Sequence, residues 1–438
     1  MSKFHYYTQK LNTIPVHLLI WKIFSKIIRI VHSFLQRGKD VLVDTRLESN
    51  IPIIKNSYIG LLELDINVDI YTRWFEKSKK QIEQVPGYPN VRIIRIPAGN
   101  WEFVPKEKIY GILDELAQNM IDFIQRKKWD YDLFHAHYVD AGIVGINVAA
   151  FFKKPLFFTA HSIGAWKKEQ MGGNADEMEK KYNFQHRIAE ELRIFKTAKA
   201  NTVTSLVQEE KLEQLYKFKS DKTAVIECGT DVHNFKPLAP NEKKIKTNLT
   251  DNYIFCLSRI DTNKGHDLLL EAFNLVKDEI ADISLVIGGG SSKPQKREKE
   301  IFTQMRKTIS AHKMDDRVQI LGYIPDELLV PYYQQARLFV LPSLFEPFGM
   351  TTTEAMACGT PVVASKFGGI RNVIETGKNG ILINPENPKE FASAMIDLLK
   401  NPENAKKIGI DGADLVKTKY SWEAIAERHI KFYLRNLN

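Results

Sequence analysis

The chain has 438 residues, of which 44% are hydrophobic and 26% are charged. This composition is typical of a globular protein and excludes a disordered chain, a collagen-like chain and a polytopic membrane protein. At roughly 150 residues per domain, the length predicts two or three domains. The 62 Lys and Arg residues exceed the 53 Asp and Glu residues, which gives a net charge of +9. This excess suits a phosphorylated substrate, an anionic membrane surface or nucleic acid, and does not distinguish among them.

Cysteine usage indicates a reducing compartment. The three cysteines, Cys228, Cys256 and Cys358, lie far apart in the sequence and include no CxxC pair. Their odd number and wide spacing argue against a disulfide framework and against a structural zinc site. We therefore expect a cytoplasmic protein.

The first recognisable element is an apolar segment, residues 14–36, in which charge recurs. Lys22, Lys26 and Arg29 interrupt the apolar run, so it predicts neither a membrane-spanning helix nor a signal peptide. On a helix, the polar residues recur at three- and four-residue steps and form one narrow stripe. Two interpretations stay open: a basic helix in peripheral contact with an anionic membrane, or a helix packed on the sheet of its own domain. We favour the second.

Short apolar runs alternate with helical patterns through the first half of the chain. Helical stretches such as 108–127 separate predicted strands at 64–72, 91–96, 131–137 and 155–159. Strands that alternate with helices predict a parallel sheet covered on both faces.

The same alternation restarts in the second half. Strands are predicted at 253–258, 283–287, 317–321, 337–342, 361–365 and 380–383. The helices between them are predicted near 266–280, 298–312, 351–358 and 388–400. The chain is therefore expected to contain two α/β halves.

The joint between the halves is residues 229–244, GTDVHNFKPLAPNEKK, which contain glycine and proline, end in charge and show no periodicity. We predict one doubly wound Rossmann-like domain over 1–235, a second over 236–415, and a helix over 416–438 that docks back on the first domain. Two such domains place ligands at the carboxyl ends of their strands, in the cleft between them.

The strongest chemical signal is FEPFGMTTTEAMACG, residues 345–359, where a strand runs into a loop and then a helix. The free N–H groups and dipole of a helix start form an anion site, and Gly349 lets the backbone approach a ligand closely. Glu346 on the loop and Glu354 on the helix would both meet a polyhydroxylated ligand attached to that anion. Alternatively, Glu354 only favours the helix dipole and Glu346 is a solvated loop acid.

A second candidate site is SRIDTNKG, residues 258–265, between a strand and a helix. Arg259 and Lys264 would project from this loop into the cleft, where their charges suit two phosphates. The alternative is a pair of solvated surface cations. The place of the loop at the carboxyl end of a strand favours the functional interpretation.

Two histidines follow strands of the first half, His137 in FHAHYVDAG and His161 in FTAHSIGAWKK. Either side chain could donate to a sugar hydroxyl, although a satisfied core histidine is the commoner fate of such a residue. The HxH spacing invites a metal site, but no third or fourth ligand follows at suitable spacing.

The two-α/β-half pattern and the motif FEPFGMTTTEAMACGTPVVAS resemble the retaining nucleotide-sugar glycosyltransferases of family four, which have the GT-B fold. The segments RIPAGNWEFVPKEKIY, HAHYVDAG, HSIGAWKKEQM and FQHRIAEELRIF are similar to the group of sucrose-phosphate and mannosylfructose-phosphate synthases. This resemblance implies transfer of mannose or glucose from a nucleoside diphosphate sugar to a sugar phosphate such as fructose 6-phosphate. It implies no cofactor and no metal, since fixed cations take that role.

The resemblance also assigns residues. It implies a catalytic set of His161, Glu346, Arg259 and Lys264. It implies donor contacts from Phe348, Gly349, Met350, Thr351 and Glu354. It implies acceptor contacts from Lys106, His137, Lys168 and Arg187, with Lys167 able to replace Lys168.

Arg187 has a further pattern around it. Glu191 lies one helical turn later on the same face and could aim the guanidinium at a phosphate. The alternative is an ordinary surface pair spaced i, i+4.

One stretch departs from the family pattern. Arg46 and Leu47 follow Asp44-Thr45 where the family has a Gly-Gly loop that lets donor and acceptor approach the backbone. This departure keeps open a catalytically impaired protein that binds sugar nucleotides. The segment 14–36 keeps open a membrane-associated transferase with a lipid-linked or glycan acceptor. A nucleic-acid partner is not expected, because no basic stripe is interleaved with aromatic residues.

Overall fold

The computed structural model describes residues 67–86, 88–105, 107–171, 174–239, 249 and 252–437. The segment 14–36, the stretch 44–47 and Lys106 lie outside these ranges, so the expectations attached to them stay predictions. Of the helices that are described, none is both long enough and apolar enough to span a bilayer.

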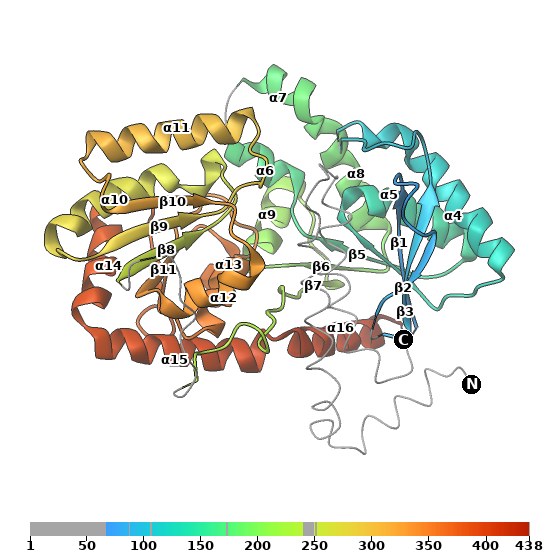
Figure 1. The fold of residues 1–438 in the computed structure, drawn as a ribbon. Coiled ribbons are helices and arrows are strands. Elements are labelled where there is room, and N and C mark those ends of the chain that lie inside the picture. Colours follow the sequence, from blue (N-terminus) through green and yellow to red (C-terminus); the bar gives the residue numbers. More distant parts are fainter. Residues whose placement is uncertain are drawn as a thin grey trace, which may run out of the picture.

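The described part of the N-terminal half holds two small sheets (Figure 1). The first has the order β1–β3–β2 and consists of β1 (Val68–Trp74), β2 (Ile82–Gln84) and β3 (Val91–Pro97). The second is wholly parallel and consists, in spatial order, of β4 (Phe134–His137), β5 (Leu156–Ala160), β6 (Ala200–Val203) and β7 (Thr223–Val225). The helices are α4 (Leu113–Lys127), α5 (Tyr138–Phe152), α6 (Gly164–Met171), α7 (Ala175–Tyr182), α8 (Phe184–Thr197) and α9 (Leu206–Tyr216).

This half differs from the sequence prediction in three places. A parallel sheet was predicted, but β2 pairs antiparallel with β3, so the sheet β1–β3–β2 is mixed. β2, β6 and β7 were not predicted, because runs of three or four residues are too short to show a pattern. The predicted helix 108–127 begins as a 3-10 turn over Ile109–Ile112 before α4 starts at Leu113.

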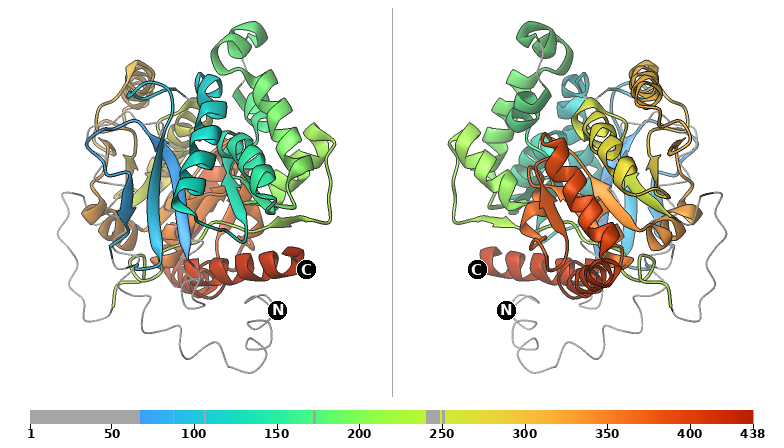
Figure 2. Two further views of the ribbon diagram at one scale, coloured as in Figure 1. Left: turned by 90° about the vertical axis from the view of Figure 1, so that its right-hand side faces the viewer. Right: turned by 90° about the vertical axis from the view of Figure 1, so that its left-hand side faces the viewer.

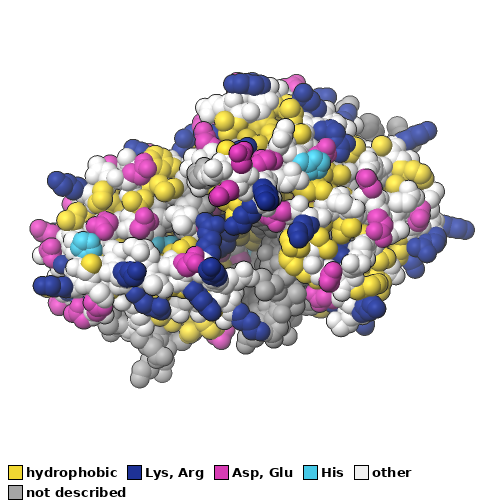
Figure 3. Space-filling model, turned by 90° about the horizontal axis from the view of Figure 1, so that it is seen from above, with side chains coloured by type: hydrophobic (Ala, Val, Ile, Leu, Met, Phe, Trp, Pro, Cys, Tyr) yellow, Lys and Arg dark blue, Asp and Glu magenta, His cyan; other side chains and the backbone are white. Residues whose placement is uncertain are grey.

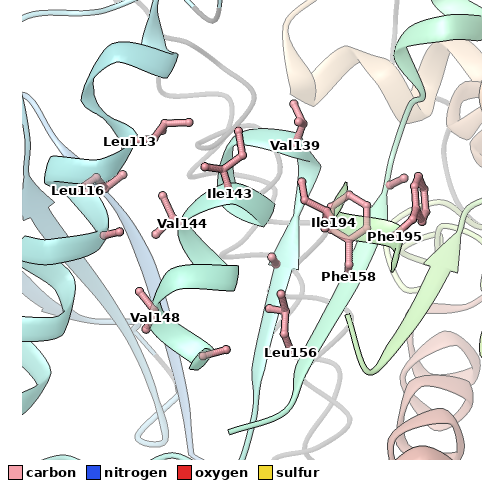
Figure 4. Packing of buried hydrophobic residues seen from close by; sticks show 14 of the residues in the cluster. Leu113, Leu116, Val139, Ile143, Val144, Val148, Leu156, Phe158, Ile194 and Phe195 are labelled. Atoms are coloured by element: carbon pink, nitrogen blue, oxygen red, sulfur yellow. The ribbon is translucent and has the colours of Figure 1, made fainter. Parts of the chain in front are cut away.

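The core of the N-terminal half lies between its sheets and its helices. Figure 4 shows side chains of α4, α5 and α8 meeting those of β5. Phe158 on β5 and Ile194 on α8 are fully buried, and Gly142 on α5 packs so closely on Ile194 that a Cβ atom would lie 2.4 Å from it. The carboxyl end of β5 is therefore held rigidly, and His161 follows it directly.

The C-terminal half is built on one six-stranded parallel sheet with the order β10–β9–β8–β11–β12–β13. This order is the Rossmann arrangement, in which the strand order reverses between β8 and β11 and leaves a crevice there for a ligand. The strands are β8 (Tyr253–Leu257), β9 (Ser284–Gly288), β10 (Val318–Gly322), β11 (Leu338–Leu341), β12 (Val362–Ser365) and β13 (Ile381–Ile383). The helices are α10 (His266–Glu279), α11 (Lys296–Ala311), α12 (Asp326–Gln335), α13 (Met350–Ala357), α14 (Pro388–Lys400), α15 (Pro402–Lys419) and α16 (Trp422–Leu437).

Helices cover both faces of this sheet, as its continuous apolar strands predict. On β8, Ile254 and Cys256 point into one core cluster, whereas Tyr253 and Phe255 point into the cluster on the opposite face. All four side chains are almost completely buried. The strands and helices predicted between 253 and 400 agree with observed elements to within about two residues, whereas α12 and α15 were not predicted and the last helix begins at Trp422 rather than at 416.

The end of the chain returns from the C-terminal half to the N-terminal half. After α15, the helix α16 leaves the C-terminal half and lies beneath the β4–β7 sheet of the N-terminal half (Figures 1 and 2). There Phe432 and Tyr433 pack on Phe157 of β5, with ring centroids 5.5 and 4.9 Å apart. The last helix thus docks on the first half, while the exact domain limits stay a prediction.

Candidate active site

The crevice of the C-terminal sheet is formed by the loops that follow β8 and β11. The first loop carries Arg259 and ends in a 3-10 turn, Thr262–Lys264. The second runs from Pro342 to Gly349, the residue that precedes α13. The backbone N–H of Leu344 donates to the Asn263 carbonyl over 3.0 Å, so the two loops are tied together at the place where the strand order reverses.

Lys264 and Glu346 form an ion pair across these loops. The Lys264 Nζ atom lies 2.7 Å from Glu346 Oε2 and also donates to the Phe345 carbonyl over 3.2 Å. The lysine side chain is only 5% exposed and the glutamate side chain 19%. The prediction that both residues face one site is therefore consistent with their geometry, and the surface-cation alternative does not fit Lys264.

Arg259 differs from Lys264 in its surroundings. Its side chain is exposed, and in the part of the chain that the structure describes no carboxylate pairs with it. It follows β8 by two residues, on the same loop as Lys264. A free guanidinium beside a neutralised lysine leaves net positive charge for an anionic ligand.

The start of α13 supplies an uncapped helix end. Gly349 precedes it with a φ of +109°, a conformation that favours glycine, and among the described residues no side chain caps the helix. Phe348 is buried behind the loop, and Met350 and Thr351 form the first turn. The first N–H groups of the helix therefore remain available to an anion.

Gly369, the second residue of a Gly-Gly pair, supports the loop that carries Glu346, and its role was not predicted from the sequence. The N–H of Gly369 donates to the Glu346 carbonyl over 2.9 Å, and a Cβ atom on Gly369 would lie 2.2 Å from the Pro347 carbonyl oxygen. Only glycine fits there, so Gly369 helps to fix the loop that carries Glu346. The Gly368-Gly369 pair, which begins three residues after the end of the predicted strand 361–365, was the signal for it in the sequence.

Glu354 lies inside α13 and is half-buried. Burial raises the pKa of its carboxyl group to about 7, and the hydroxyl of Tyr333, which donates to it over 2.9 Å, counteracts part of that rise. Tyr333 lies on α12, and its place beside Glu354 had no signal in the sequence. The glutamate is therefore a tyrosine-bonded acid that is partly shielded from water.

This pKa predicts a pH-dependent stability effect. An acid whose pKa rises on folding destabilises the folded state increasingly as the pH rises from its unfolded value, near 4.5, to about 7. Glu354→Gln should therefore raise the melting temperature at pH 8 and change it little at pH 4. Thermal unfolding at both pH values measures this, with the exposed Glu386→Gln as control. An equal shift at both pH values would contradict the shielded-acid interpretation.

In the N-terminal half, His161 follows β5 and His137 ends β4. Both are buried, and His137 Nδ1 lies 2.8 Å from His161 Nε2. Burial lowers the pKa of His161 to about 3, so its ring is neutral. The Nδ1 atom of His161 has no hydrogen-bond partner among the described residues. His137 was predicted to contact an acceptor, and the structure places it directly against His161.

Arg187 and Glu191 form a buried pair on α8. The Arg187 Nε atom lies 2.7 Å from Glu191 Oε1, and the two side chains are 7% and 2% exposed. The guanidinium also donates to the carbonyl and hydroxyl of Ser162, which follows His161. Glu191 further accepts from the Gly164 N–H over 2.8 Å. The pairing predicted from the i, i+4 spacing is present, and the surface-pair alternative is wrong because both groups are buried.

A pocket opens beside Arg187, between α5, α6 and α8. Its lining also carries two acids, aromatic rings and the ammonium group of Lys167, and consists of Glu107, Tyr110, Tyr138, Val139, Asp140, Lys167, Tyr182, Phe184 and Arg187. Lys168 does not line the pocket, and its Nζ atom instead lies 3.4 Å from Glu179 Oε2. Of the two adjacent lysines, Lys167 is therefore the one beside Arg187.

The two half-sites face each other. Trp166 on α6 packs edge-on against Phe345 of the β11–α13 loop, with centroids 4.6 Å apart. Arg371 and Glu210 form an ion pair between the halves, and Gly369 lies close to Ser205. Figure 3 shows Lys and Arg side chains around the hollow between the halves. Within the described residues, no three His, Cys, Asp or Glu side chains are grouped so as to hold a metal ion.

Comparison with known proteins agrees with this architecture. The family model "Glycosyltransferase Family 4" matches residues 56–234, and "Glycosyl transferases group 1" matches residues 239–414. Mannosylfructose-phosphate synthase of Agrobacterium fabrum is 32% identical over 84% of this chain and 82% of its own length. D-inositol 3-phosphate glycosyltransferase of Corynebacterium glutamicum is 29% identical over 85% of this chain and 88% of its own.

A solved structure extends the likeness to three dimensions. Sucrose-phosphate synthase of Thermosynechococcus elongatus superimposes with a TM-score of 0.75 and 28% identity, covering 89% of this chain and 93% of that one. Both halves of the chain therefore have counterparts in that structure. The chain belongs to glycosyltransferase family four and has the GT-B fold.

Proposed function

We propose that this chain transfers a hexosyl unit, glucose or mannose, from a nucleoside diphosphate sugar to a sugar phosphate such as fructose 6-phosphate, with retention of the anomeric configuration. The names of the three similar proteins each contain a phosphorylated sugar or polyol. The same reaction class is the simplest assignment for a chain that shares their length and both of their domains.

The donor diphosphate is assigned to the crevice of the C-terminal half. Arg259 is exposed and unpaired within the described residues, Lys264 is buried on the same loop, and α13 starts without a side-chain cap. Together they supply the charge and the N–H groups that two phosphates require. Glu346 is assigned to hydroxyls of the donor sugar, and Glu354 to the ribose.

The acceptor phosphate is assigned to the pocket beside Arg187, and this is the observation that carries the proposal. Glu191 and Ser162 hold the guanidinium in one orientation, and Lys167 lines the same pocket. A buried, aimed guanidinium costs free energy to build and suits a charge-assisted hydrogen bond to phosphate. Ser162 follows His161 directly, so the pocket adjoins the histidine assigned to the donor sugar.

The chemistry assigned here is front-side displacement. The bond between the anomeric carbon and the diphosphate oxygen breaks, and the acceptor hydroxyl oxygen bonds to that carbon on the same face. The departing oxygen takes the proton of the hydroxyl, so the protein needs no strong base. Its residues position the reactants and stabilise the charge on the leaving diphosphate.

A donor-by-acceptor panel tests the proposal. UDP-glucose and GDP-mannose would each be incubated with fructose 6-phosphate, fructose, inositol phosphate and a lipid phosphate, with products detected by mass. A phosphorylated disaccharide from one donor and fructose 6-phosphate supports the proposal, and NMR of its anomeric proton reports retention. Nucleotide-sugar binding without any product would indicate a catalytically impaired protein, and product only with the lipid acceptor would overturn the sugar-phosphate assignment.

Turnover should survive EDTA, because Arg259, Lys264 and the start of α13 supply the positive charge at the diphosphate. Initial rates would be compared in EDTA, in Mg²⁺ and in a matched buffer of Mg²⁺ with excess EDTA. Equal rates are expected. Loss of activity in EDTA that Mg²⁺ or Mn²⁺ restores would show that these cations do not suffice.

A further inference from the structure

Three imidazoles form a column in the protein interior, behind the cleft. His135 and His137 lie two residues apart on the same face of β4, and His161 follows the neighbouring strand β5. The rings of His135 and His137 stack with centroids 4.4 Å apart, and those of His137 and His161 with centroids 5.1 Å apart. The column runs from the underside of the sheet to the residue assigned to the donor sugar.

The hydrogen bond within the column constrains the protons. His137 Nδ1 and His161 Nε2 are 2.8 Å apart, and in two neutral rings one of these atoms must carry the proton while the other accepts it. The tautomer of His137 therefore determines the tautomer of His161. The His161 Nδ1 atom is buried and lacks a hydrogen-bond partner in the described structure, so it is the atom left to meet a ligand.

The far end of the column is anchored. His135 Nε2 lies 2.7 Å from the Thr159 hydroxyl, and its Nδ1 bonds the Tyr433 hydroxyl of α16. Thr159 is bonded in turn to Thr202 of β6. The His135 ring is thus fixed on both nitrogens and presents a rigid face on which His137 stacks.

The three imidazole rings of the column are neutral at neutral pH. Burial lowers the pKa of His135 and His137 well below the usual value, and neighbouring histidines lower it further. Burial lowers the pKa of His161 to about 3 and that of His429 to about 4. Each ring therefore exists as one of two neutral tautomers rather than as an imidazolium.

We propose that His137 is a positioning residue: through its Nδ1 atom it fixes the tautomer and the ring orientation of His161, and thereby presents one defined His161 Nδ1 atom to the donor sugar. The last step rests on the proposed function. The competing interpretation is that His137 only fills space in the core.

Nitrogen NMR of the ligand-free protein tests the hydrogen-bonding step alone. In protein labelled with ¹⁵N-histidine, His161 should show one protonated and one unprotonated nitrogen, the signature of a single tautomer. His137→Leu should move the two shifts toward an average. His137→Asn, whose amide occupies the place of Nδ1, should restore the separation, whereas His137→Gln, whose amide lies farther out, should not.

The control is His429→Leu, which removes another buried histidine of the same region that does not bond His161. It should leave the His161 shifts unchanged. Unchanged His161 shifts in folded His137→Leu would overturn the proposal. If the leucine variant does not fold, the contrast between the asparagine and glutamine variants decides, and equal shifts in those two overturn it as well.

Kinetics then test the link to the donor sugar. His137→Leu and His137→Gln should lower kcat by about 10- to 100-fold, by analogy with the loss of a group that orients a metal-binding histidine. The KM of the donor should change little, and His137→Asn should recover most of the rate. A protein that shows the NMR effect but turns over no substrate would refute the proposed function and leave the positioning role standing.

Discussion

Lys264→Met should weaken binding of a nucleoside diphosphate by about 1.5–3 kcal/mol, or roughly 10- to 150-fold, the scale of a charged hydrogen bond. In the unaltered protein the Glu346 carboxylate lies 2.7 Å from Lys264 Nζ. The variant loses this ammonium group and leaves the carboxylate without its counter-charge beside the phosphates. Isothermal calorimetry with UDP and with GDP measures the loss.

Two further variants separate the causes. In Lys264→Met/Glu346→Gln the unpaired carboxylate is gone, so this double variant should bind the diphosphate more tightly than Lys264→Met alone. Lys277→Met removes a lysine from α10, the helix that follows the same loop, where its partner is the exposed Asp278. It should leave the affinity unchanged, and unchanged affinity in Lys264→Met would remove Lys264 from the site.

Arg187→Met should destabilise the protein by about 3–5 kcal/mol, because it leaves the Glu191 carboxylate buried and unpaired. Arg193→Met removes an arginine from the same helix whose ion pair with Glu190 is partly exposed. That control should cost about 0.2–1 kcal/mol. Urea unfolding of both variants at one pH compares them directly, and equal costs would contradict the buried-pair assignment.

The catalytic effect needs a variant that folds. Arg187→Met/Glu191→Gln removes the buried charge, while the amide oxygen of the new glutamine can still accept from the Gly164 N–H, as Glu191 does. This double variant should raise the KM of fructose 6-phosphate strongly and that of the donor little, and it should affect plain fructose much less. A variant that treats phosphorylated and plain fructose alike would remove the sugar-phosphate assignment and leave the family membership intact.

The fold of the C-terminal half was predictable because its strands are short, largely apolar runs that alternate with helical patterns. The Glu346 loop and the Arg187–Glu191 pair were predictable too, since both depend on residues close together in the sequence. β6 and β7 were not, because they are short and gain their identity only from neighbours in the sheet.

Contacts between distant elements explain the remaining misses in the site. Tyr333 reaches Glu354 from another helix, and His137 reaches His161 from the adjacent strand. Local sequence spacing gives neither the distance nor the relative orientation of side chains on different elements. The sequence therefore placed His137 near the cleft but could not show that it contacts His161. The choice between Lys167 and Lys168 likewise depends on the phase of α6, a helix of eight residues with mixed character on all sides.

The docking of α16 has a consequence for biosynthesis. Phe157 and Ala200, on β5 and β6, complete their apolar surroundings only against Ile425, Phe432 and Tyr433. On the ribosome, the face of the β4–β7 sheet that carries Phe157 and Ala200 therefore lacks its contacts with α16 while about two hundred further residues are made. The N-terminal half is translated first, yet this apolar cluster is complete only after residues 422–437 have emerged.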